Sequence, residues 1–177
     1  MKHFFLTADD GNPLPQIINL HNQIDIRHTN KQDARKIAQL TSLLVRHVHG
    51  VETFYADVLT HPLFMVSKGV AEVMSFYDAS IDYKIAVLFD LEAKISKTYF
   101  IPILDHVECL AEGTEFNLDH SVIRHAIIDP NRTMGKPVFK LAGVKNTYIV
   151  IRLDFAESLL RRRAVGLKLK EICVKKA

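Results

Sequence analysis

The chain has 177 residues, of which 48% are hydrophobic, and its net charge is +3. This composition supports a hydrophobic core and excludes a disordered chain. Two cysteines without a CxxC pair exclude a disulfide framework and indicate a reducing compartment. No segment has the length and apolarity of a membrane span or a secretory signal. We therefore expect one domain over residues 1–177, located in the cytoplasm and without membrane contact.

The net charge conceals an uneven distribution along the chain. Residues 1–130 carry 11 Lys/Arg and 17 Asp/Glu, a net charge of −6. Residues 131–177 carry 12 Lys/Arg and 3 Asp/Glu, a net charge of +9. All 9 histidines also lie in the acidic part. A dense basic segment attracts anions and indicates a phosphate-bearing partner.

The first half of the chain predicts one strand and then helices. Residues 2–7 predict a strand that ends at an Asp-Gly-Asn-Pro turn. A helix is expected from Thr29 or Asn30 to Gly50, because apolar side chains recur there at spacings of three and four residues. Those apolar positions are Ala34, Ile37, Leu40, Leu44 and Val48. Residues 51–60 extend as a second helix up to the break that Pro62 imposes.

The middle of the chain predicts a third helix and a hairpin. Residues 66–77 have a helical pattern, and 83–90 with 98–104 are rich in β-branched and aromatic residues. The last two segments predict two paired strands. Residues 119–128 form either a short helix or a strand, and periodicity does not decide between them.

The last third predicts a hairpin, a helix and a final strand. Residues 137–141 and 147–153 flank a loop that contains Gly143, which indicates a hairpin. A helix follows from Asp154, and Gly166 is expected to end it with a positive φ. Residues 167–174 alternate as a strand does. Together these elements predict an α+β fold, with a mainly antiparallel sheet packed against three or four helices.

Basic side chains of the last third are the candidate site. We expect nucleic-acid contacts from Arg132, Lys136, Lys140, Lys145, Arg161, Arg162, Arg163, Lys168 and Lys170. The three consecutive arginines cannot all face a core, and Phe139 and Tyr148 can stack on bases if they are exposed. The alternative is structural, because arginines suit the end of a helix and lysines protect an edge strand.

One segment resembles a known family. Asp129-Pro130, the Gly135-Lys136-Pro137-Val138 run, and Gly143-Val144 with Thr147 resemble the small bacterial helix-turn-helix domains associated with VapB-type antitoxins. The resemblance covers about a quarter of the chain and lacks the threonine-arginine pair usual after that run. It implies nucleic-acid binding and a helix over 147–153, where the residue pattern predicts a strand.

Four residue pairs have side chains that can carry chemistry. They are His47 with His49, His106 with Cys109, His120 with Ser121, and Glu108 with Glu112. None is accompanied by the further ligands of a zinc site or by a nucleophile elbow, and no phosphate-binding glycine motif is present. The sequence therefore predicts no catalytic residue, no metal site and no cofactor.

These observations favour a non-catalytic binding or regulatory protein, of the kind found on bacterial mobile elements, whose basic C-terminal surface contacts nucleic acid. The first alternative is an adaptor that binds an acidic partner protein. The second is an enzyme with a histidine-containing pocket. The oligomeric state stays open, and a homo-oligomer is compatible with the sequence.

Overall fold

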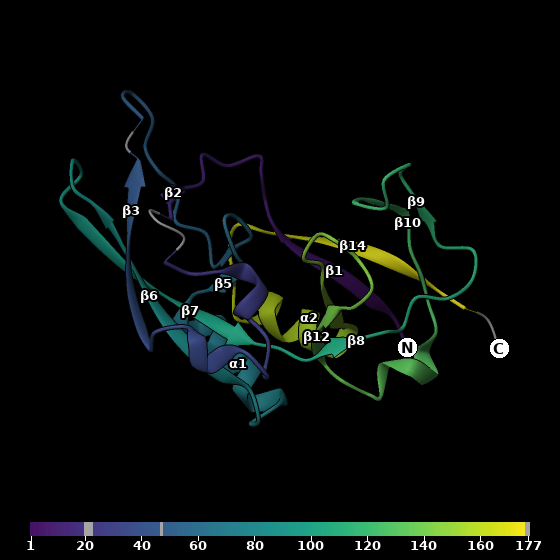
Figure 1. The fold of residues 1–177 in the computed structure, drawn as a ribbon. Coiled ribbons are helices and arrows are strands. Elements are labelled where there is room, and N and C mark those ends of the chain that lie inside the picture. The colour runs from purple at the N-terminus through teal and green to yellow at the C-terminus, as the bar shows by residue number, and fades with distance from the viewer. Residues whose placement is uncertain (20–22, 47, 176–177) are drawn as a thin grey trace.

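The computed structural model describes residues 1–19, 23–46 and 48–175 (Figure 1). The two α-helices of this part of the chain are α1 (Lys68–Tyr77) and α2 (Leu153–Arg161). The strands are β1 (His3–Ala8), β2 (Gln16–Ile18), β3 (Leu40–Arg46), β4 (Val58–Leu59), β5 (Met65–Val66), β6 (Asp82–Asp90), β7 (Ile95–Ile103), β8 (His106–Val107), β9 (Glu115–Phe116), β10 (Ile123–His125), β11 (Ile127–Ile128), β12 (Val138–Leu141), β13 (Ile149–Arg152) and β14 (Leu167–Val174). Short 3-10 turns lie at Ile26–His28, Ala34–Lys36 and Pro130–Thr133.

The expected fold class is wrong. The protein is mostly β-sheet, with 37% of the described residues in strands and 17% in helices. The strands form two six-stranded sheets and one two-stranded ribbon, so the prediction of one sheet against three or four helices fails. The two missing helices are those expected over residues 29–50 and 51–60.

The first missing helix is replaced by strand β3. Along β3 the exposed and buried side chains alternate, so that Thr41, Leu43 and Val45 are buried. This period of two is present in the sequence beside the helical spacing, and pairing with β6 and β2 decides between them. The Asn30 side chain accepts the backbone N–H groups of residues 32 and 33, as a helix cap would, but only the 3-10 turn Ala34–Lys36 follows.

Some of the other local predictions are wrong and others are confirmed. The second missing helix is replaced by an irregular segment that ends in β4. The uncertain segment 119–128 forms strands β10 and β11. The predicted strand at the start, the helix in 66–77, both hairpins, a helix after the second hairpin and the last strand are confirmed. The boundaries of that second helix were wrong, because Arg152 rather than Asp154 is its N-cap and it ends at Arg161, well before Gly166. The helix that the family resemblance implies over 147–153 is absent, because β13 occupies 149–152.

Two split β-α-β units form the centre of the fold. Helix α1 connects β5 to β6, and β7 lies between these two strands, antiparallel to both. Helix α2 connects β13 to β14 in the same way, and here β1 lies between them, antiparallel to both. The N-terminal strand therefore completes a unit that is otherwise built from the end of the chain.

The equivalence of the two units extends to neighbouring strands. One sheet has the order β3-β6-β7-β5-β4 and the other β11-β14-β1-β13-β12, with the same parallel or antiparallel pairing at each step. Strand β6 starts at residue 82 and β14 at residue 167, 85 positions apart. The buried helix residues Val70, Ala71 and Met74 correspond at this spacing to Phe155, Ala156 and Leu159.

The hydrophobic core has three parts that follow this arrangement. The central part contains the buried faces of both helices with side chains from both sheets, such as Leu6 and Val66. The second lies on the far face of the β3-β6-β7 sheet, around Leu43 and Tyr99. The third lies on the far face of the β14-β1-β13 sheet, around Phe139. In Figure 1 the helices accordingly lie between the β6–β7 hairpin and the β1–β14 pair.

Replacing Gly166 by alanine should destabilise the fold by about 2 kcal/mol or more. Its φ is +69°, and an added Cβ would lie 2.4 Å from the Cβ of Ala56, inside contact distance. Gly143 is the matched control, because its φ of +77° is similar while no atom lies within 4 Å of the added Cβ. Gly143→Ala should therefore cost only the backbone strain, about 1 kcal/mol. Urea unfolding measures both, and equal losses would contradict the packing argument.

Candidate binding site

The nine predicted basic residues do not form one surface. Lys140 is only 4% exposed and lies in the interior. Lys136 forms an ion pair with Asp105, and Arg132 donates to the backbone carbonyl of Leu110 at 3.3 Å. Lys145 is exposed in the loop between β12 and β13. Three of these four residues are already engaged with protein groups, because the buried Lys140 donates to Thr29.

The remaining five basic residues lie on opposite faces of the β14-β1-β13 sheet. Arg161, Arg162 and Arg163 are exposed at the end of α2, which packs on the face that contains Leu6. Lys168 and Lys170 lie on the other face, because their partners across β1 are Thr7 and Phe5. The prediction that all nine residues contact one nucleic acid stays untested. A nucleic acid that lies on one face of the sheet would reach only some of these nine residues.

A groove on that second face contains Lys168 and Lys170. We call it the β1–β14 groove, and its volume is about 380 Å³. We call the two six-stranded sheets, each with its connecting loops, the two halves of the molecule. The groove is lined by side chains from both halves: Phe5, Thr7, Ala8, Asp10, Leu14, Thr60, His61, Ile123, Tyr148, Lys168 and Lys170. Small-molecule and side-chain pockets of proteins usually have volumes of about 300–1,000 Å³, so the groove has the size of a binding site.

The floor of the β1–β14 groove is rigid and apolar. The rings of Phe5 and Tyr148 pack with centroids 5.2 Å apart, and the Tyr148 hydroxyl accepts the backbone N–H of Ile123 at 3.0 Å. Phe139, the other aromatic residue considered for stacking on bases, is fully buried in the core on this face of the sheet. The exposure that stacking requires is therefore absent at Phe139, and the half-buried Tyr148 ring is held in the floor of the groove.

The lysines give the groove a positive rim. Lys168 lies 3.5 Å from Asp10, but both side chains are well exposed, so this ion pair is weak. Within the described residues, Lys170 has no ion pair with a carboxylate. The groove thus combines an apolar floor with a cationic edge. It suits a ligand that has an apolar group next to a negative charge.

Phe5, Leu14 and His61 could not be assigned to this groove from the sequence. They come from three separate segments of the acidic part. Only the pairing of β1 with β14 brings them beside the lysines. The alternating lysines were the one local signal of the site.

The residue pairs considered for catalysis do not assemble. His106 and Cys109 belong to a segment in which burial alternates, so the histidine is exposed while the thiol is buried. Burial raises the pKa of Cys109 to about 11, which leaves the thiol protonated at neutral pH. The hydroxyl of Ser121 donates to Asp119 at 2.7 Å, and His120 instead contacts the ring of Phe116.

The other two pairs give no site either. Glu108 and Glu112 are exposed and do not belong to a helix, so the expected one-turn spacing is lost. His47 lies outside the described residues, and His49 has interactions within the protein. No group of three or more potential metal ligands occurs in the described ranges.

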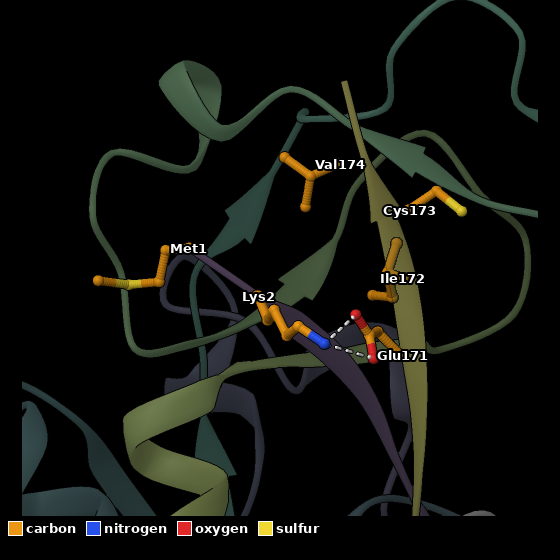
Figure 2. A pocket seen from close by; sticks show the side chains of 6 residues that line it. All are labelled: Met1, Lys2, Glu171, Ile172, Cys173 and Val174. Atoms are coloured by element: carbon orange, nitrogen blue, oxygen red, sulfur yellow. Dashed lines mark hydrogen bonds and ion pairs between the residues drawn. The ribbon is translucent and has the colours of Figure 1, made fainter. Parts of the chain in front are cut away.

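A second hollow lies between the N-terminus and the end of β14 (Figure 2). Its volume is about 500 Å³. Its two charged side chains, Lys2 and Glu171, neutralise each other in an ion pair of 2.9 Å across the strands. Because no net charge remains and the ion pair is exposed, this hollow has no feature that selects a ligand.

An apolar sheet face lies exposed beyond the end of α1. Helix α1 covers Tyr83 and Phe100 on the face of the β3-β6-β7 sheet. Farther along, the side chains of Leu40, Leu44, Ile85, Val87 and Phe89 are half-buried or exposed and belong to no core cluster. On β7 the small polar residues Thr98 and Ser96 lie opposite Val87 and Phe89, and the exposed Arg46 of β3 borders this face next to Leu44.

Comparisons of the chain with protein-family models, with curated proteins and with solved structures find no match. Among the described residues, no helix has the length and apolarity needed to cross a membrane.

Treatment with EDTA should leave the melting temperature unchanged. No group of three or more potential ligands occurs in the described ranges, so we expect no contribution of a metal to the folding energy there. Differential scanning calorimetry with and without chelator tests this, and elemental analysis supplies an independent count of metal per chain. A fall of several degrees, or one equivalent of zinc, would contradict the prediction.

Proposed function

We propose that the protein is a non-catalytic adaptor that binds an acidic, apolar segment of a partner protein in the β1–β14 groove. The observation that carries the proposal is the groove itself, where Lys168 and Lys170 border a floor of Phe5 and Tyr148. A cytoplasmic location is part of the proposal, and the free thiols of Cys109 and Cys173 support it.

The groove suits a protein segment because its apolar floor and its lysine rim adjoin each other. Lys170 lies directly across from Phe5 in the sheet. A Leu or Phe side chain from the partner can cover the apolar floor and remove it from water, which contributes about 1.5–3 kcal/mol. A neighbouring Asp or Glu then meets the lysines at the rim. Such rim charges contribute up to about 1 kcal/mol each and favour the correct partner.

A protein partner agrees better with the structure than a nucleic acid does. Single-stranded nucleic acids bind by stacking bases on exposed rings, and here Phe139 is buried and Tyr148 is fixed in the groove floor. The apolar face of Leu44, Val87 and Phe89 also favours a protein, because large exposed apolar patches mark protein interaction sites.

Nucleic-acid binding remains the second candidate, and one observation favours it. Arg161, Arg162 and Arg163 are consecutive and exposed, and only Arg161 has a carboxylate nearby, at 3.7 Å from Glu157. Phosphate contacts from these residues would not require the groove. The two candidates therefore depend on different faces of the sheet.

The adaptor proposal is tested with an array of ten-residue peptides in which acidic, basic and apolar positions vary. We expect binding to peptides that place Asp or Glu beside Leu or Phe, and weakening by about tenfold when both Lys168 and Lys170 are changed to alanine. The matched control, Arg161→Ala with Arg162→Ala, removes the same charge from the opposite face. This control should bind the peptides as the unchanged protein does.

A gel shift at about 50 mM salt with random duplex and single-stranded oligonucleotides tests the second candidate. Phosphate contacts would give binding that weakens steeply with salt, by about 0.9 logarithmic units per contact on duplex DNA. Changing Arg161, Arg162 and Arg163 to alanine would reduce that slope by up to about three units. Oligonucleotide binding without peptide binding would overturn the adaptor proposal, and failure of both assays would overturn both candidates.

A further inference from the structure

We infer that a cavity beside Lys140 is a binding site for a small oxyanion, either a carboxylate or a phosphate-type group. The cavity has a volume of about 260 Å³ and lies at the edge of the β14-β1-β13-β12-β8 sheet, apart from the β1–β14 groove. Its walls are residues 141–147, the side chains of His106 and Lys140, and Ile26 with Arg27 from the other half of the molecule.

The ammonium group of Lys140 is buried without a carboxylate. Its Nζ donates to the carbonyl oxygen of Thr29 and, at 2.6 Å, to the Thr29 hydroxyl oxygen. Both acceptors are neutral, and no carboxylate of the described residues lies within ion-pair distance. Buried lysines usually have a charged partner, because an isolated charge in the protein interior is costly. An anion in the adjoining cavity would supply that partner.

The nearby carboxylates are already engaged by other cations. Asp105 precedes His106 and forms ion pairs with Lys31 and Lys136. Asp25 is bound by Arg27 at 2.6 Å, which also neutralises that arginine. The positive charge left around the cavity therefore belongs to Lys140 and to Lys145, which is exposed in the loop.

The loop that forms one wall adds unused hydrogen-bond donors. The N–H groups of Leu141 and Ala142 bond to Tyr148 and Val107, but none from Gly143 to Thr147 has a backbone partner within the described ranges. Gly143 has a φ of +77°, the left-handed conformation found where successive N–H groups form an anion-binding concavity. Lys140 and these loop residues line the same cavity.

The ionisation of Lys140 makes anion binding in this cavity depend on pH. Burial lowers the pKa of Lys140 to about 8, and burial together with the Lys140 charge lowers the pKa of His106. His106 is therefore neutral at pH 7 and offers one ring N–H. The attraction for an anion is complete below pH 8 and is lost as the pH rises through that value, because Lys140 then loses its proton.

The test is a titration of isotope-labelled protein with sodium sulfate or sodium acetate, followed by amide NMR at constant ionic strength. We expect saturable shifts of the amides of residues 143–147, and the tighter of the two anions identifies the ligand class. Lys140→Met should weaken this binding by tenfold or more. Lys94→Met, which removes an equal charge from the exposed turn between β6 and β7, outside both pockets, should leave it unchanged.

The pH dependence of sulfate binding by the unchanged protein gives a second test, which does not depend on whether a variant folds. Sulfate affinity should be constant from pH 6.5 to 7.5 and fall by about tenfold per pH unit above 8, the pKa of the group that must stay charged. Unsaturable shifts with both anions, an affinity unaffected at pH 9.5, or undiminished binding in a folded Lys140→Met protein would each overturn the inference.

Discussion

The insertion of β1 between β13 and β14 is the constraint on which the rest of the structure depends. Both neighbours belong to the last 29 residues of the chain, so this unit cannot close its sheet before the two termini meet. Without β1, a whole row of backbone hydrogen bonds on each neighbouring strand would be lost, and α2 would have no continuous sheet to cover. Such sequence separation makes folding slow and ties both halves into one cooperative structure.

Both the β1–β14 groove and the Lys140 cavity lie at the junction of the two halves that the insertion of β1 joins. The β1–β14 groove combines Leu14 and His61 of one half with Lys168 of the other, and the Lys140 cavity receives Arg27 in the same way. The halves are also joined by Asp57, whose carboxylate accepts the N–H of residue 165 at 2.7 Å. A ligand at either pocket therefore contacts both halves and stabilises their relative position, as in many proteins whose binding sites lie between structural units.

Sequence reasoning succeeded where local signals and tertiary pairing agree. The last strand follows from the alternation of Leu167 to Lys170, and Gly166 has the positive φ that was expected, although α2 already ends at Arg161. It failed over residues 40–46, where helical and strand periods coexist and only the partner strand β6 decides. The β1–β14 groove was indicated only by its lysines. The burial of Lys140 against Thr29 had no local signal, because the two residues lie 111 positions apart.

The charge asymmetry of the sequence is partly neutralised by contacts within the fold. Asp105 and Asp10 of the acidic part face Lys136 and Lys168, and Lys140 is withdrawn from the surface. At physiological salt, exposed charges act over only about 8 Å, so the scattered lysines and arginines that remain do not add up to one long-range field. A ligand gains from them only at contact distance, where shape decides whether it can approach. For the two proposed sites, selectivity would therefore come from the apolar floor of the groove and from the N–H groups of the loop, with charge acting as the final discriminator.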